Sequence, residues 1–216
     1  MRPTKTPAAA AAAVSGTGFA VLLALVAAGW EPLLALDRAV AADLHGEALA
    51  RPGLTRTARV LTDWVWDPWT MRLLTSAAAA VLWRRGERSY AACAVGAALA
   101  GLVLQQALKS AVGRGRPRWR HPVDSAHFAA FPSGHALAAA VACGLLLWVL
   151  RRHGAVGVRW GAALAAGAVS AAGAGASRLW LGVHWLSDVV GGWLLGVCVV
   201  ALSVVCYGRL ALSRAR

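Results

Sequence analysis

Long apolar runs separated by short polar segments divide most of the chain into six candidate helices. The runs cover about 15–36, 62–83, 89–110, 134–151, 159–177 and 186–207. Each run is close to the roughly 20 apolar residues that a helix needs to cross the core of a bilayer. The second run is the weakest, because Asp63, Asp67 and Pro68 crowd its start. The pattern therefore predicts an all-α fold, a bundle of six transmembrane helices.

The first run also resembles a signal peptide, since Arg2 and Lys5 precede it. However, its apolar stretch extends from about Val14 to Leu36, whereas a typical signal peptide has an apolar region of about 7–15 residues. We therefore expect an uncleaved first helix. The length of 216 residues fits one domain over 1–216, with the motifs described below in a core of about 89–207.

Composition supports membrane insertion. Apolar residues make up 59% of the chain and charged residues 14%, against about 45–50% and about 25% in an average soluble domain. The net charge of +13 is compatible with nucleic acid, an anionic membrane surface or an anionic substrate, but the apolar runs argue against nucleic acid. The four cysteines lie inside apolar runs without CxxC spacing, which indicates buried thiols rather than disulfides or a metal site.

Loop charge predicts the orientation in the membrane. Six spans place the segments 1–14, 84–89, 151–160 and the tail from 209 on one side of the bilayer. These segments contain Arg2, Lys5, Arg84, Arg85, Arg88, Arg151, Arg152, Arg159, Arg209, Arg214 and Arg216, but only one acidic residue, Glu87. By the positive-inside rule this side is cytoplasmic. We therefore expect a multi-pass protein of the cell membrane with both termini in the cytoplasm.

One loop on the opposite, extracytoplasmic side contradicts this charge bias. The loop at 111–133 and the residues just before it contain five basic residues within twelve positions, which are Lys109, Arg114, Arg116, Arg118 and Arg120. The other outward segments are a loop at 37–61 and a short turn at 178–185. A basic outward loop is explained if it binds an anion, such as a phosphate group.

Three polar clusters fall on this same side of the predicted bundle. They are Lys109 with Arg116 and Pro117, the PSGH segment at 132–135, and Ser177–Arg178 with His184 and Asp188. Lysine and arginine supply positive charge for phosphate oxygens. Ser133 and Gly134 open a helix, whose free N–H groups and dipole favour an anion. The clusters therefore predict a phosphate site of Lys109, Arg116, Ser133, Gly134 and Arg178.

The histidines suit the chemistry of phosphoryl transfer. His184 and Asp188 are four residues apart, hence on one helix face, and a carboxylate on one ring nitrogen makes the other a better nucleophile. His135 is placed to protonate the leaving oxygen. The catalytic set is thus His184, His135 and Asp188. We expect no metal and no cofactor, because adjacent cationic side chains would repel a metal ion.

These clusters together resemble the signature of the type 2 phosphatidic acid phosphatase (lipid phosphate phosphatase) superfamily. The matching segments are KSAVGRGRP from Lys109, PSGH from Pro132 and SRLWLGVHWLSD from Ser177. The resemblance implies a metal-independent integral membrane phosphatase that forms a phosphohistidine at His184, with His135 as the acid. It also implies that the phosphate contacts Lys109, Arg116, Ser133, Gly134, His135 and Arg178. The site would open on the extracytoplasmic face.

The natural substrate stays open among phosphorylated lipids. Undecaprenyl pyrophosphate leads, and phosphatidylglycerophosphate and phosphatidic acid are alternatives. An anionic-lipid transporter would use the same basic pocket without hydrolysis. Vanadium haloperoxidases look similar at these motifs, but they are larger soluble proteins. The oligomeric state and the role of residues 37–61 are likewise open.

Several residues outside the motifs have simpler interpretations. Arg114, Arg118 and Arg120 bind either anionic headgroups or the second phosphate of a pyrophosphate. Asp63 and Asp67 are expected at a helix end or the membrane interface. The histidines without a motif partner are expected in loops, and they are His45, His121, His127 and His153. Many tryptophans near span ends fit an aromatic belt without a catalytic role.

Overall fold

The described residues, 6–214 of this computed structural model, form helices joined by short connections and one longer loop. The helices are α1 (Pro7–Ala27), α2 (Glu31–Ala50), α3 (Pro52–Val60), a π-helical turn (Leu61–Val65), α4 (Pro68–Arg84), α5 (Arg88–Val112), α6 (Gly134–Arg152), α7 (Gly157–Trp180) and α8 (Leu186–Arg214). No strand occurs between residues 6 and 214, which confirms the all-α prediction.

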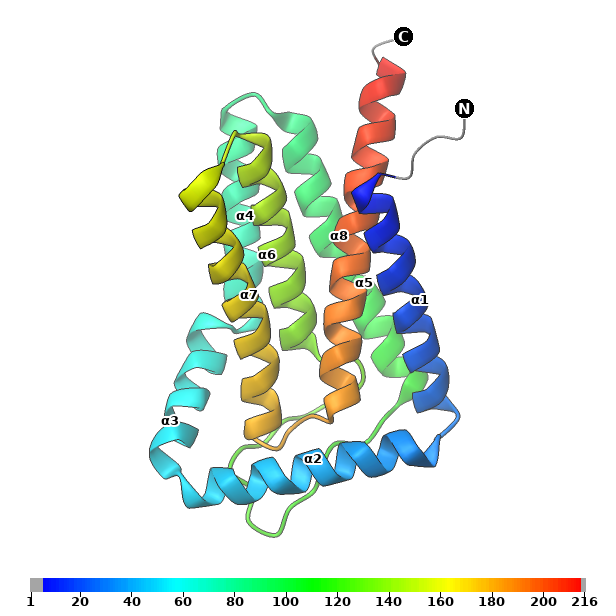
Figure 1. Ribbon diagram of the computed structural model, residues 1–216, viewed down its shortest axis with the longest axis vertical. Coiled ribbons are helices and arrows are strands. Elements are labelled where there is room, and N and C mark those ends of the chain that lie inside the picture. The colour runs from blue at the N-terminus through cyan, green and yellow to red at the C-terminus, as the bar shows by residue number, and fades with distance from the viewer. Residues whose placement is uncertain (1–5, 215–216) are drawn as a thin grey trace.

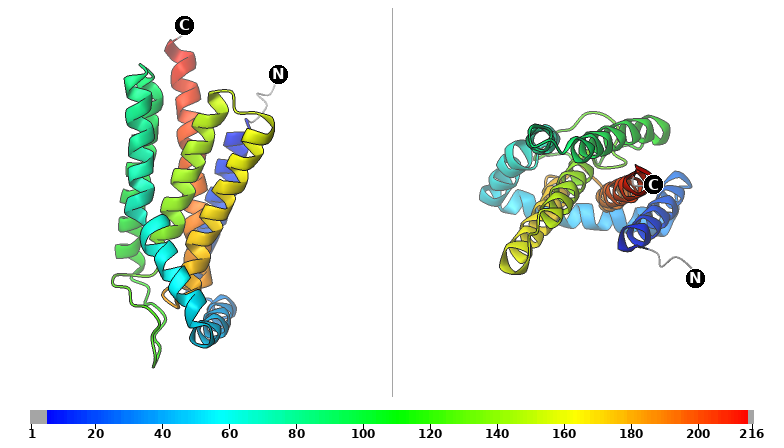
Figure 2. Two further views of the ribbon diagram at one scale, coloured as in Figure 1. Left: turned by 90° about the vertical axis from the view of Figure 1, so that its left-hand side faces the viewer. Right: turned by 90° about the horizontal axis from the view of Figure 1, so that it is seen from above.

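The long helices run side by side as a bundle, and α2 lies across one end of it (Figure 1). The start of α1 and the end of α8 lie at the opposite end (Figures 1 and 2). Within the described part of the chain, α1, α5, α6 and Leu186–Leu210 of α8 are long and apolar enough to cross a membrane. Helix α4 has 17 residues and α7 has 24, and neither is among these four. Six crossings therefore stay a prediction.

The predicted first run, 15–36, is not one helix. Helix α1 ends at Ala27, and Gly29 adopts a left-handed conformation with φ of 66°. Such a conformation costs glycine little, and it turns the chain away from the α1 axis. Pro32 then occupies the first turn of α2, where its missing N–H group is tolerated. The last residues of the apolar run therefore belong to α2.

The expected loop at 37–61 is also wrong, because these residues are almost wholly helical. The buried residues of α2 are Asp37, Ala41, His45 and Ala48, spaced four, four and three apart. This spacing defines one face of a helix, and that face lies against the bundle. The stripe is hard to recognise in the sequence because two of its four members are polar.

A break also divides the second predicted run, 62–83. Asp67 precedes α4 as its N-cap, and its Oδ1 accepts hydrogen bonds from the backbone N–H groups of Trp69 (2.8 Å) and Thr70 (3.4 Å). Pro68 takes the first helical position. Asp67 is thus a helix-end residue, as expected, and the bundle part of the run begins only at Pro68.

Small residues set the contact between α6 and α8. A Cβ atom added to Gly192 would lie 2.6 Å from the backbone oxygen of Ser133, and one added to Gly196 would lie 2.7 Å from the Cβ of Ala140. Glycine at these positions lets the two helices approach closely, as small residues do in lipid-embedded bundles. Because Ser133 and Gly134 begin α6, this contact also fixes the motif residues relative to α8.

Candidate active site

The three motif clusters meet at the end of the bundle that α2 crosses. Lys109 lies in the last turn of α5, and Arg116 follows in the loop at 113–133. Ser133 is the N-cap of α6, and Arg178 lies in the last turn of α7. His184 occupies the turn between α7 and α8. A cavity of about 240 Å³ is lined by six of the sequence-predicted residues, namely Lys109, Arg116, Gly134, His135, Arg178 and His184.

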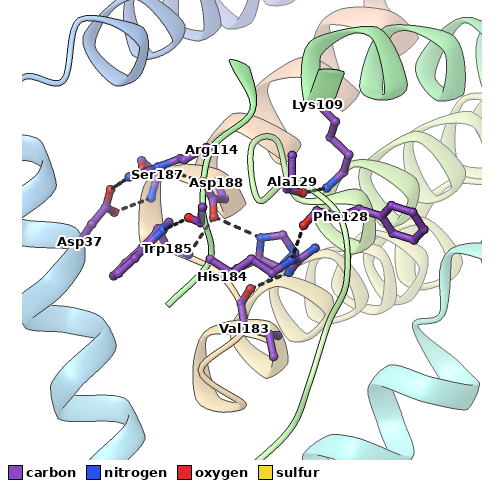
Figure 3. Close-up of polar contacts among 12 residues, drawn as sticks. Asp37, Lys109, Arg114, Phe128, Ala129, Val183, His184, Trp185, Ser187 and Asp188 are labelled. Atoms are coloured by element: carbon purple, nitrogen blue, oxygen red, sulfur yellow. Dashed lines mark hydrogen bonds and ion pairs between the residues drawn. The ribbon is translucent and has the colours of Figure 1, made fainter. Parts of the chain in front are cut away.

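His184 and Asp188 form a hydrogen-bonded pair (Figure 3). The ring Nδ1 lies 3.2 Å from Asp188 Oδ2, and the other ring nitrogen, Nε2, lies 3.0 Å from a terminal nitrogen of Arg116. A guanidinium group only donates, so Nε2 accepts and the ring proton is assigned to Nδ1, which donates to Asp188. The lone pair of Nε2 therefore faces the cationic side of the site.

The environment of His184 keeps the ring neutral. Burial, followed by the positive charges of Arg116 and Arg178, holds the pKa of His184 well below its ordinary value of 6.5. A neutral imidazole has a free lone pair, which a nucleophile requires. The charge pattern around the ring thus favours the form that can attack a phosphorus atom.

This lowered pKa predicts how stability depends on pH. Below about pH 6.5 the unfolded chain binds a proton at His184 that the folded protein does not bind, so stability falls as the pH falls. One such group contributes up to about 1.4 kcal/mol per pH unit. We expect His184→Asn to show a shallower loss of thermal midpoint between pH 6.5 and 5 than the wild type in detergent. Equal slopes in the two proteins would show that His184 is not held neutral.

The two cations of the first motif are oriented by backbone carbonyls of the loop at 113–133 and of the turn between α7 and α8. Lys109 Nζ donates to the carbonyl oxygen of Ala129. Arg116 Nε donates to the carbonyl oxygen of Phe128 at 2.9 Å, and its NH1 donates to that of Val183 at 2.6 Å. Burial, and then the charge of Arg178, lowers the pKa of Arg116 to about 10, which leaves the group charged at neutral pH.

These contacts make Arg116 hard to replace by lysine. A lysine retains the charge but cannot donate to Phe128, Val183 and His184 in one fixed plane. We expect Arg116→Lys to lower kcat/KM for phosphate release about 10- to 100-fold, with a small fall in thermal midpoint from the lost hydrogen bonds. Kinetics in detergent with a phosphorylated lipid measure the first quantity. A variant with wild-type kcat/KM would show that the planar fork is not required.

Two side-chain atoms of the predicted phosphate-binding residues are buried without a hydrogen-bond partner among the described residues. They are the Oγ of Ser133 and the Nε of Arg178, both in buried side chains. Arg178 is otherwise held loosely, with NH1 3.6 Å from Asp124 Oδ2 and 3.5 Å from Thr62 Oγ1. Buried polar groups are normally paired. Free donors beside the start of α6 suit an anion with several oxygens.

Sequence reasoning was wrong about Arg114. Its NH1 donates to Asp188 Oδ1 at 2.7 Å and its NH2 donates to Asp37 Oδ2 at 2.7 Å, so its donors are engaged inside the protein. These two buried ion pairs hold Arg114 inside the protein and argue against a role in binding a headgroup or a second phosphate. Arg118 and Arg120 are exposed, and both of their interpretations stay open.

Sequence reasoning also missed Asp37 and Ser187 and misplaced His45. Asp37 and Ser187 adjoin the histidine–aspartate pair, and no motif marks Asp37 because it belongs to a distant helix. His45 is not in a loop but is buried in α2, where its ring stacks on Trp119 with centroids 4.1 Å apart. His153 lies, as expected, in the connection after α6, where it caps that helix and pairs with Glu87.

The fold and the site together define a structural class of protein. The protein is a helical bundle with apolar, membrane-length helices, and a histidine–aspartate pair surrounded by cations lies at one end of it. The family model of the PAP2 superfamily matches residues 90–211, and the chain belongs to that superfamily. This family is the one that the three motifs resemble, so the predicted resemblance is confirmed.

A solved structure has a similar fold. It is the crystal structure of a transmembrane PAP2-type phosphatidylglycerolphosphate phosphatase from Bacillus subtilis, with a TM-score of 0.74 and 22% sequence identity. The match covers 92% of this chain and 96% of that chain. No curated protein matches the sequence. The family and the fold together support a phosphatase that acts on lipids in a membrane.

Proposed function

We propose that this protein is a membrane lipid phosphatase that works through a phosphohistidine on His184. The observation that carries the proposal is the His184–Asp188 pair, whose unprotonated Nε2 accepts from Arg116 beside a cavity lined by Lys109, Arg116 and Arg178. Cations around a nucleophile stabilise the charge on a transferring phosphoryl group. The phosphate head would occupy the cavity while the lipid tail stays between helices and bilayer.

The first step forms a bond between His184 Nε2 and phosphorus. The bond between phosphorus and the leaving oxygen breaks, and His135, which the negative charge of the bound phosphate favours in its protonated form, transfers its proton to that oxygen. The proton on Nδ1 of His184 stays on the ring, in its hydrogen bond to Asp188. The ring consequently becomes positively charged while it carries the phosphoryl group.

The second step restores the enzyme. His135, now neutral, accepts a proton from a water molecule whose oxygen attacks phosphorus. The bond between Nε2 and phosphorus breaks, inorganic phosphate leaves, and His184 regains its lone pair. Lys109, Arg116, Arg178 and the N-terminus of α6, with Ser133 and Gly134, hold the phosphoryl oxygens in both steps.

Undecaprenyl pyrophosphate is the substrate that the sequence analysis put first, and phosphatidylglycerophosphate is now supported equally well. The second is favoured by the name of the Bacillus subtilis protein of similar fold. Undecaprenyl pyrophosphate has a second phosphate that needs extra cations. Arg118 and Arg120 are the exposed arginines of the loop that could bind it, since Arg114 is paired with Asp188. Phosphatidic acid is the third candidate.

We further propose a plasma-membrane location with six crossings, cytoplasmic termini and an extracytoplasmic site. The connections at 85–87 and 153–156 lie at the same end of the bundle as the start of α1 (Figure 1). The arginines near these connections are Arg84, Arg85, Arg88, Arg151, Arg152 and Arg159. By the positive-inside rule, this charge supports a cytoplasmic location for that end. Arg2, Lys5 and Arg216, which also entered the prediction, lie outside the described residues.

The test is phosphate release in detergent from the three lipids in parallel, with and without EDTA. We expect release from at least one lipid at an unchanged rate in EDTA, because the proposed site uses only protein cations. A rate that falls in EDTA and recovers with a divalent cation would contradict metal independence. Lipid binding without any release would favour the transporter reading instead.

A further inference from the structure

A buried chain of polar groups extends from the histidine–aspartate pair to helix α2 (Figure 3). Arg114 NH1 donates to Asp188 Oδ1 at 2.7 Å, and Arg114 NH2 donates to Asp37 Oδ2 at 2.7 Å. Asp37 also accepts from the backbone N–H of Ser187 at 2.8 Å and from the Ser187 hydroxyl at 2.5 Å. Asp37 is 1% exposed and Asp188 is 0% exposed.

These buried polar groups give the Asp188 carboxylate a fixed set of hydrogen-bond donors. Its Oδ2 faces Nδ1 of His184 and accepts the backbone N–H of Trp185 at 2.9 Å, while its Oδ1 accepts from Arg114. Arg114 is in turn held by Asp37 and by the Ser187 hydroxyl, 2.7 Å from its NH1. The orientation of the carboxylate that faces His184 therefore depends on a residue of α2.

The formal charges of Asp37, Arg114 and Asp188 suggest a second role for Asp37. Arg114 alone would neutralise Asp188, and His184 would then have no net negative charge behind it. With Asp37 included, two carboxylates share one guanidinium group. The three side chains Asp37, Arg114 and Asp188 then carry a net charge of −1. Buried charges interact more strongly than exposed ones. This net charge balances the positive imidazole ring that forms when Nε2 bonds phosphorus.

We propose that Asp37 is a positioning residue for the nucleophile, which acts through Arg114 to orient Asp188 and to balance the charge of the phosphorylated His184 ring. The proposal rests on the proposed phosphatase function. Asp37 contributes from α2, which lies outside the matched residues 90–211, so neither the family match nor the motifs include it.

The test compares Asp37→Asn with Asp43→Asn, a matched change at an exposed position of the same helix. The readouts are kcat, KM, and inhibition by vanadate and by inorganic phosphate. Vanadate can bond to Nε2 and reproduce the five-coordinate transition state, whereas phosphate needs only the cations. The thermal midpoint reports any loss of fold.

We expect Asp37→Asn to lower kcat about 10- to 100-fold and to weaken vanadate inhibition by a similar factor. KM and phosphate inhibition should change less than about threefold, and Asp43→Asn should behave as the wild type. Asp37→Glu, which keeps the charge, should recover part of kcat. Supporting residues of this kind act on the transition state more than on the ground state.

Two results would overturn the inference. Asp37→Asn that matches Asp43→Asn in kcat would show that the α2 carboxylate does not act on the nucleophile. Equal weakening of vanadate and phosphate, with a lowered midpoint and no recovery in Asp37→Glu, would show a role in the fold alone. A wild type that releases no phosphate from any lipid would instead refute the proposed function.

Discussion

His184→Ala should abolish phosphate release, with a loss of about 10⁴-fold or more in kcat. The alanine removes the only side chain that we assign to bond with phosphorus, and nucleophile deletions in triad enzymes cost this much or more. The cations remain, so binding of the lipid phosphate should persist. Phosphate release in detergent measures the first effect, and direct binding of the lipid to the variant measures the second.

His153→Ala is the matched control. His153 caps α6 at the opposite end of the bundle and pairs with Glu87, far along the chain from the site. Its removal should leave kcat within about twofold of the wild type, because it touches none of the reacting groups. Unimpaired release from His184→Ala would refute the phosphohistidine mechanism. Trapping of labelled phosphate on wild type but not on His184→Ala would support it.

Gly192→Ala should impair both stability and activity. The added Cβ would lie 2.6 Å from the Ser133 backbone oxygen, 2.9 Å from the Ala136 Cβ and 3.1 Å from the Leu137 backbone nitrogen. Backbone atoms cannot yield as a flexible side chain can, so α8 must move away from the start of α6. Overpacking of this kind costs about 1–3 kcal/mol. The movement would also separate Ser133 from Asp188, whose backbone oxygen accepts the Ser133 N–H at 2.9 Å.

Gly208→Ala tests the same change in the same helix without the clash. Apart from its chain neighbours and the adjacent backbone of its own helix, no atom lies within 4 Å of a Cβ built on Gly208. Alanine is a better helix former than glycine by about 1 kcal/mol, so this variant should be as stable as the wild type or more so. Thermal midpoints and rates of phosphate release of the two variants measure the effect of the added Cβ at the α6–α8 contact. Equal behaviour of Gly192→Ala and Gly208→Ala would mean that the α6–α8 contact is looser than described.

The motifs made much of the site predictable from sequence. Lysine, arginine and histidine are expensive to place in apolar surroundings, so their occurrence at fixed spacings next to apolar runs indicates function. The structure brings Lys109, Arg116, His135, Arg178 and His184 to one cavity, as the spacing predicted. Their catalytic roles stay predictions until the variants above are measured.

The parts that could not be predicted depend on tertiary contacts. An apolar run does not show where a glycine adopts positive φ, so the turn at Gly29 and the separate helix α2 were missed. Nor does a basic loop show which arginine turns inward. Arg114 is paired with two buried carboxylates, whereas Arg118 is exposed, and one of those carboxylates comes from a helix that the sequence pattern had assigned to a loop.

The position of Asp37 has a consequence for recognising active relatives. If the counter-charge of the nucleophile is supplied by α2, a chain can retain all three motifs and still have a much slower nucleophile because of a change far upstream. Motif-bearing sequences would then divide into fast and slow enzymes by the residue at this one helical position. An assay panel chosen by that residue, rather than by the motifs, would separate the two groups.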